Sequence, residues 1–139
     1  MEKNHYVITI GNMADYWKHV LAKIHQQCTL ASNGECLLWP ASKCTAGYGQ
    51  TSVRGLRERY VHRLVVMATL QTADIGGRRT HTNCSHLCHN SRCCKADHIS
   101  LEPVLINNQR KNCLSEGKCS GHTLLGKCYP GCHVNLRIK

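Results

Sequence analysis

The sequence predicts a small α+β domain held together by bound metal rather than by a large apolar core. Segments with helical spacing alternate with short segments typical of strands, and 139 residues is the size of one domain. The chain contains no Phe, two Trp and three Met, but eleven Cys and ten His. So few bulky apolar residues imply cross-links, either disulfides or metal. We therefore expect residues 1–139 to form a single domain.

The cysteines favour zinc over disulfides. The first residues, MEKNHYVITIGN, carry Glu2 and only a short apolar run, which is not the pattern of a secretory signal peptide. Disulfides are rare in reducing compartments, where zinc sites of thiolates and imidazoles are common. An odd count of eleven also leaves one cysteine over in any intramolecular disulfide scheme. We expect an intracellular protein, nuclear in a eukaryote, and a disulfide framework is the less favoured alternative.

The charge of the chain predicts a polyanionic partner. Eighteen Lys and Arg against eight Asp and Glu give a formal net charge of +10, and nucleic acid is the commonest partner of such a surface. No apolar run approaches the roughly 20 residues that cross a bilayer, and no basic amphipathic helix has an aromatic apolar face. We therefore expect no membrane contact, and an ordinary basic surface is the alternative.

The N-terminal region, residues 12–35, is predicted to contain a helix over residues 12–28. Asn12 is a suitable N-cap, and residues 5–10 before it are typical of a short strand or an ordered arm. One face of the helix carries residues at helical spacing, namely Met13, Trp17, Val20, Ile24 and Cys28.

Residues 36–70 are predicted to form a basic hairpin and a core helix. After the apolar run CLLWP at 36–40, residues 48–61 alternate weakly and turn at Arg54-Gly55. Arg54, Arg57 and Arg59 lie on this hairpin, and a two-stranded ribbon fits the DNA major groove. The alternative is an edge hairpin that charge protects from aggregation. Residues 61–70, VHRLVVMATL, are the most apolar stretch and predict a core helix.

The segment CSHLCHNSRCCKADH, residues 84–98, predicts most of a metal site. The spacing Cys88-x4-Cys93-x4-His98 supplies three zinc ligands, and either Cys36 or Cys44 can supply the fourth. Beyond a helix predicted for residues 103–112, the region 113–139 holds a complete second set, namely Cys113, Cys119, His122 and Cys128. Two structural zinc ions should be a condition of folding. Five cysteines stay without a role, namely Cys28, Cys44, Cys84, Cys94 and Cys132.

These residues resemble a known family. SHLCHNSRC at 85–93, followed by His98 and by residues 107–113, resembles the His-Cys box homing endonucleases of the HNH, or ββα-metal (His-Me finger), nuclease superfamily. YWKHV, CLLWP, GYG and VHRLVVM upstream are similar to segments of small HNH-type enzymes. The resemblance covers about residues 16–128 and implies a zinc-stabilised ββα-metal nuclease domain, with the active-site motif over 84–112.

The resemblance also implies a role for each site residue. It gives the first zinc site as Cys36, Cys88, Cys93 and His98, and the second as Cys113, Cys119, His122 and Cys128. It makes His86 the general base and Asn107, with Asn108 as the near alternative, the ligand of a catalytic Mg²⁺ or Mn²⁺. A neutral imidazole can take a proton from water, and a hard cation stabilises the charge that develops on a phosphate. Double-stranded DNA is the implied substrate, cut to 5′-phosphate and 3′-hydroxyl ends.

Two departures from the family pattern bear on function. The family has an arginine on the first hairpin strand that contacts the scissile phosphate, and Gln50 occupies that position here, with Arg54 or Arg57 as nearby substitutes. The His-Cys box enzymes form homodimers in which a C-terminal tail crosses to the partner subunit, and that tail is longer than residues 129–139 here. A homodimer is therefore possible for this chain, but we do not expect it to form by exchange of tails. A zinc-stabilised DNA-binding module without catalysis is the alternative function. An RNA-binding protein is disfavoured because the chain lacks clustered aromatics for stacking bases.

Overall fold

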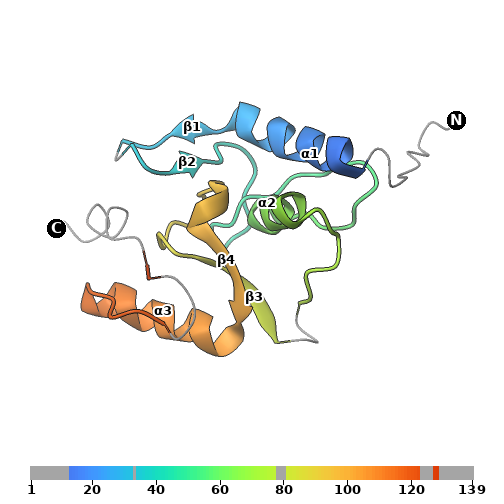
Figure 1. The fold of residues 1–139 in the computed structure, drawn as a ribbon. Helices are drawn as coiled ribbons and strands as arrows, with labels where there is room; N and C mark the ends of the chain where they lie inside the picture. The colour runs from blue at the N-terminus through green and yellow to red at the C-terminus, as the bar shows by residue number, and fades with distance from the viewer. Residues whose placement is uncertain (1–12, 33, 78–80, 123–126, 129–139) are drawn as a thin grey trace, which may run out of the picture.

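The computed structural model describes residues 13–32, 34–77, 81–122 and 127–128 as a small α+β fold (Figure 1). The predicted arm at residues 5–10 and the N-cap Asn12 lie outside these residues, as does Cys132. The elements follow in the order α1 (Met13–Gln27), β1 (Thr29–Leu30), β2 (Leu37–Leu38), α2 (Val61–Leu70), β3 (Thr82–His86), a 3-10 turn (Ala96–His98), β4 (Ile99–Pro103) and α3 (Val104–Glu116). The predicted fold class is confirmed.

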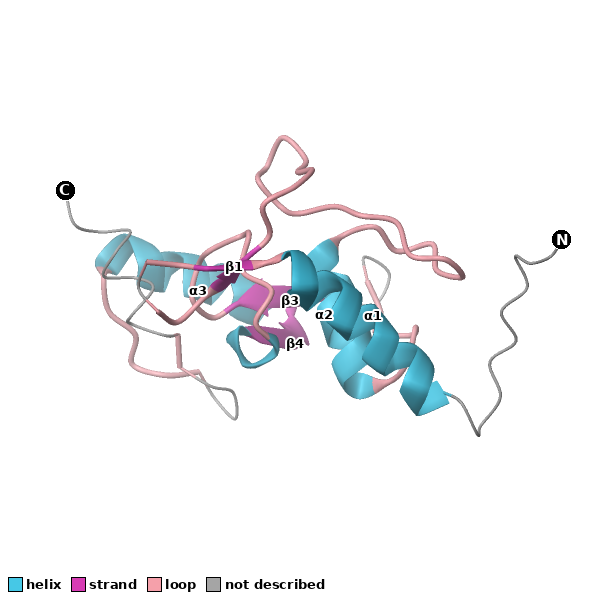
Figure 2. Ribbon diagram, turned by 90° about the horizontal axis from the view of Figure 1, so that it is seen from above, coloured by secondary structure: helices cyan, strands magenta, loops and turns pink. Residues whose placement is uncertain are grey.

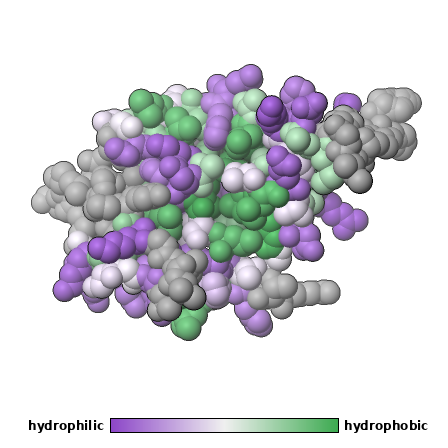
Figure 3. All heavy atoms as spheres, viewed as in Figure 1, coloured by the Kyte–Doolittle hydropathy of each residue, from purple (hydrophilic) through white to green (hydrophobic). Residues whose placement is uncertain are grey.

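The apolar core forms mainly between α1 and α2. Trp17, Val20 and Ile24 of α1 are buried at the predicted helical spacing, and Tyr16 joins them. They pack with buried residues of α2, a helix whose bounds are those that the sequence predicts. Since α2 supplies six buried residues in ten positions, it is the central helix of the core. On the face seen in Figure 3, hydrophobic side chains gather over α2 and hydrophilic ones surround them.

The predicted hairpin over residues 48–61 is only partly correct. The chain doubles back at Arg54-Gly55, but the described residues there form one isolated bridge, Gln50↔Tyr60, instead of two strands. The ladder stops because Val53 turns into the core, while the Tyr16 hydroxyl donates to the carbonyl of Arg54. The returning arm is held instead by Glu58, whose carboxylate pairs with Arg63 of α2 at 2.7 Å. Figure 2 shows the result as a long loop between β2 and α2.

The β3–β4–α3 unit positions the polar residues that matter for function. β3 and β4 are antiparallel, with Cys84 opposite Leu101, Ser85 opposite Ser100 and His86 opposite Ile99. Because side chains alternate across a sheet, Cys84 and Ile99 join the core while Ser85 and Glu102 face the other side. α3 covers that other side, and Arg110 is its one buried residue among those described. α3 therefore docks through polar contacts rather than through an apolar stripe.

No helix among the described residues is long and apolar enough to span a bilayer.

Candidate metal centres and active site

The first cluster brings Cys36, Cys88, Cys93 and His98 together, all of them buried. Cys88 and Cys93 lie in the loop after β3, and His98 ends the 3-10 turn before β4. Cys36 reaches them because Leu38 of β2 forms a bridge with Cys93, and the backbone N–H of Cys94 donates to the carbonyl of Leu37 at 2.7 Å. Residue spacing allows either Cys36 or Cys44 as the fourth ligand, and the family resemblance implies Cys36. The structure places Cys36 in the cluster, whereas Cys44 is not in it.

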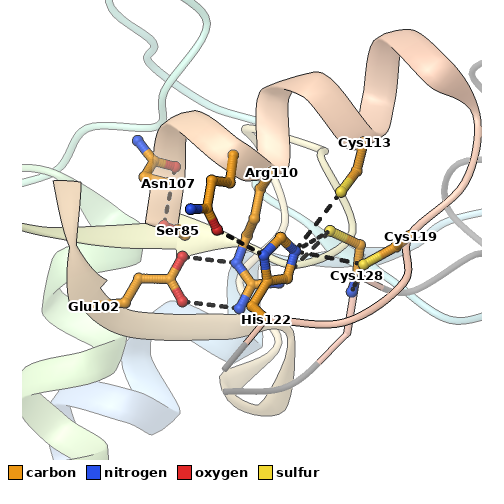
Figure 4. Close-up of polar contacts among 9 residues, drawn as sticks. Ser85, Glu102, Asn107, Arg110, Cys113, Cys119, His122 and Cys128 are labelled. Carbon is orange, nitrogen blue, oxygen red and sulfur yellow. Dashed lines mark hydrogen bonds and ion pairs between the residues drawn. The ribbon is translucent and has the colours of Figure 1, made fainter. Parts of the chain in front are cut away.

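The second cluster brings Cys113, Cys119, His122 and Cys128 together next to the C-terminal half of α3 (Figure 4). Cys113 lies on α3, and the other three follow that helix. Two neighbours on α3 contact the cluster: Gln109 Oε1 lies 3.3 Å from His122 Nδ1, and Arg110 Nη1 donates to Cys128 Sγ at 3.5 Å. These contacts fix the orientation of the ligand side chains and anchor α3 to the cluster.

The geometry of both clusters fits tetrahedral zinc. With Zn–S bonds of about 2.3 Å and a Zn–N bond of about 2.05 Å, a regular tetrahedron has N···S edges of about 3.6 Å. The His98 Nδ1 atom lies 3.6 Å from Cys36 Sγ and 3.5 Å from Cys93 Sγ. In the second cluster the His122 Nε2 atom lies 3.7, 3.4 and 3.9 Å from the sulfurs of Cys113, Cys119 and Cys128.

The chemistry of the thiols agrees with metal binding. Hydrogen bonds from Cys36 and Cys88 lower the pKa of the Cys93 thiol, while hydrogen bonds to Cys36 and Cys93 raise the pKa of Cys88, so Cys93 is the thiol of this group that most readily becomes the thiolate that zinc binds. Among the described residues every cysteine is free of disulfides. Of the cysteines outside the clusters, Cys84 is a buried core residue, and Cys28 and Cys94 hydrogen-bond each other beside the first cluster.

His86 lies at the end of β3 with a defined tautomer. Its Nε2 atom is 3.0 Å from the carbonyl oxygen of Cys93. A carbonyl can only accept, so Nε2 carries the hydrogen and Nδ1 keeps a lone pair. Burial lowers the pKa of His86, which favours the neutral imidazole. Because Cys93 belongs to the first metal cluster, that cluster also holds the carbonyl that orients His86.

His62 and Tyr48, for which the sequence analysis predicts no role, pack against His86. The ring centroid of His62 lies 5.0 Å from that of His86 and 5.0 Å from that of Tyr48. Burial, with help from the positive charge of Arg63, lowers the pKa of His62 to about 3, so His62 stays neutral. The available signal was a polar histidine within the apolar run VHRLVVM, which sequence reasoning treated only as core.

Asn107 lies on α3 next to Ser85. The Ser85 hydroxyl donates to Asn107 Oδ1 at 2.9 Å (Figure 4). Ser85 and His86 are consecutive on β3 and point to opposite faces, so the amide and the imidazole flank the same end of the strand from two sides. Mg²⁺ keeps most of its waters and takes one or two protein oxygens, so the half-buried Asn107 amide fits as such a donor.

The predicted DNA contacts lie on the loop between β2 and α2. Arg54, Arg57 and Arg59 are exposed, and Gln50 is half-buried at its bridge with Tyr60. Tyr48, two residues before Gln50, has its ring centroid 6.0 Å from that of His86. The middle of this loop, at Tyr48, therefore lies beside His86.

The comparisons with known proteins agree with this geometry. A family model described as the zinc-binding loop region of homing endonuclease matches residues 35–137. The chain belongs to this family. The match spans both metal clusters and the β3–β4–α3 unit, so it confirms the predicted His-Cys box type of domain and indicates a zinc-binding, nuclease-related protein. Neither the comparison with curated proteins nor that with solved structures gave a match.

Proposed function

We propose that this homing-endonuclease-type domain is a Mg²⁺-dependent endonuclease that hydrolyses double-stranded DNA. The observation that carries the proposal is the hydrogen bond from His86 Nε2 to the Cys93 carbonyl, 3.0 Å long. It leaves Nδ1 as a basic nitrogen on an imidazole that burial keeps neutral. A neutral imidazole in a fixed tautomer is what a general base requires.

His86 would take a proton from a water molecule at Nδ1. The oxygen of that water would then form a bond to the phosphorus while the bond from phosphorus to the 3′ oxygen breaks. The departing 3′ oxygen would take a proton from solvent water, which leaves 5′-phosphate and 3′-hydroxyl ends. The rings of His62 and Tyr48 pack against the imidazole and limit its rotation. Because His62 stays neutral, it adds no positive charge that would oppose proton transfer to His86.

Asn107 would hold the divalent cation through Oδ1. Mg²⁺, when bound, neutralises the negative charge that develops on the phosphate. An amide is a neutral ligand, so it leaves more of the cation's charge for the phosphate than a carboxylate would. The contact between Ser85 and Asn107 supports this role because it joins the candidate metal ligand to the strand that carries His86.

The net charge of +10 supports a DNA substrate, and the exposed Arg54, Arg57 and Arg59 offer cations to its phosphates or bases. The test is incubation of the zinc-loaded protein with supercoiled plasmids and a random-sequence DNA library, with Mg²⁺ and with EDTA. We expect cleavage by the wild type with Mg²⁺ alone. Absence of cleavage across the library, with zinc sites filled, would refute the nuclease.

One observation favours a second candidate, a zinc-stabilised module that binds DNA without cutting it. Gln50 stands where the family has an arginine on the scissile phosphate, and loss of that cation would weaken transition-state stabilisation. The Gln50→Arg variant separates the two functions. A drifted enzyme should cleave faster with the arginine restored, whereas a binding module should gain affinity for DNA without producing ends.

A further inference from the structure

The contact between α3 and the β3–β4 hairpin is polar and almost fully buried. Ser85 is 1% exposed, and Glu102 and Arg110 are 2% and 1% exposed. Arg110 donates to both carboxylate oxygens of Glu102, from Nε at 2.7 Å and from Nη2 at 2.9 Å (Figure 4). Buried charges persist only where they are paired and hydrogen-bonded. This interface therefore fixes its members in place, and Asn107 lies at its edge on the same helix.

The hydrogen bond from Ser85 decides which end of the Asn107 amide faces the strand. A serine hydroxyl has one hydrogen, and here it goes to Asn107 Oδ1 at 2.9 Å. An amide oxygen has two lone pairs, so Ser85 occupies one and leaves the other for a cation. An asparagine without such a donor can rotate and exchange its oxygen and nitrogen ends at small cost, which would remove the oxygen from the metal.

The surroundings of Ser85 hold its hydroxyl in position. Ser85 is paired with Ser100 in the β3–β4 ladder, so its backbone is fixed. Burial alone raises the pKa of the Glu102 carboxyl, but hydrogen bonds, those from Arg110 first among them, outweigh burial and hold the pKa of Glu102 below its ordinary value. The Ser85 hydroxyl also lies near this carboxylate, but its single hydrogen is donated to the amide oxygen of Asn107. Without it, the nearby carboxylate would attract the NH₂ end of the amide.

We propose that Ser85 is a positioning residue for the divalent cation, because its hydroxyl holds the Asn107 amide with Oδ1 directed for metal binding. This role rests on the proposed function of Asn107. Groups that hydrogen-bond a metal ligand change metal affinity by about 10–100-fold when removed. Ser85→Ala should therefore weaken binding of the cation by about tenfold.

The test measures Mn²⁺ binding by the loss of the free-ion EPR signal, using full-length zinc-loaded protein in complex with DNA. The variants are Ser85→Ala, Ser85→Thr, Ser100→Ala and Asn107→Ala. Ser85→Thr keeps the hydroxyl and should bind Mn²⁺ as the wild type does. Ser100→Ala is the matched control, since it removes a hydroxyl that bonds Glu102 from the same interface without touching the contact to Asn107. Zinc content and melting temperature check that each variant is folded.

We expect weak Mn²⁺ binding for Ser85→Ala, recovery with Ser85→Thr and little change for Ser100→Ala. Wild-type affinity in Ser85→Ala, when Asn107→Ala has lost the ion, would overturn the role of Ser85 and leave the proposed metal site intact. An equal loss of Mn²⁺ affinity in Ser85→Ala and Ser100→Ala would show that Ser85 only packs the interface. Wild-type affinity in Asn107→Ala would overturn the metal site and the role of Ser85 together.

Discussion

Replacement of Arg110 by Met should destabilise the domain by several kcal/mol. The side chains of Arg110 and Glu102 are 1% and 0% exposed, and they form an ion pair. Removing one partner of a buried ion pair costs about 3–5 kcal/mol, because the other charge stays buried without compensation. Arg110→Met also removes the donor to Cys128 Sγ. For a domain of this size the loss corresponds to a fall in melting temperature of roughly 10–20 °C.

The pH dependence of the stability that Arg110→Met loses tests whether this loss is electrostatic. In the wild type the pKa of Glu102 is lowered, so the pair stabilises the fold above the ordinary carboxyl pKa, and this stability is lost as the pH falls through the lowered pKa. In Arg110→Met, burial without a partner raises the pKa of Glu102. The unpaired carboxylate then destabilises the variant more as the pH rises. The difference in stability between the two proteins should therefore grow from pH 5 to pH 8.

Urea unfolding in zinc-saturated buffer, followed by circular dichroism, measures the difference at each pH. Lys111→Met is the matched control, since Lys111 is the exposed neighbour on α3 and should change stability by less than about 0.5 kcal/mol. The double variant Glu102→Gln, Arg110→Met should lose less free energy of unfolding than the two single variants lose together. A loss below about 1 kcal/mol in Arg110→Met, or one that does not vary with pH, would contradict the buried ion pair.

The remaining predictions concern metal and DNA. The protein should bind about two zinc ions, one for each cluster. A strong chelator should then abolish the helical circular dichroism signal, and a folded zinc-free protein would exclude structural zinc. Arg57→Ala should reduce the slope of log affinity for DNA against log salt by about one, whereas Lys18→Ala on α1 should not; equal slopes would remove Arg57 from the interface. Asn107→Ala should abolish Mg²⁺-dependent cleavage, whereas Asn108→Ala should not. The reverse result would identify Asn108 as the metal ligand.

The sequence predicted those features that local patterns encode. Helical spacing located α1 to within one residue at each end, and the apolar run at 61–70 coincides with α2. The ligand sets were recognisable because three members of the first set and all of the second lie within short segments. Cys36 lies 52 residues before Cys88, and residue spacing alone could not choose it over Cys44.

Contacts between distant residues could not be predicted in the same way. The Glu102–Arg110 pair, the Ser85–Asn107 hydrogen bond and the packing of His62 on His86 each depend on how α3 and α2 lie against the hairpin. The predicted strands over 48–61 do not form because Val53 turns inward, and the weak alternation of apolar and polar residues there does not indicate this turn. Arginine within a predicted helix normally means an exposed position, so its burial at Arg110 had no local signal.

The proposed function depends above all on His86 as the base of a metal-dependent nuclease. The single-turnover cleavage rate, with saturating Mg²⁺ and on a DNA that the wild type cuts, reports this role without interference from product release. His86→Ala is compared with His19→Ala, which removes an exposed histidine of α1. We predict that His86→Ala slows cleavage by about 10²–10⁴-fold with unchanged zinc content and DNA affinity, while His19→Ala cleaves as the wild type does. Cleavage at the wild-type rate by His86→Ala would show that His86 is not the base.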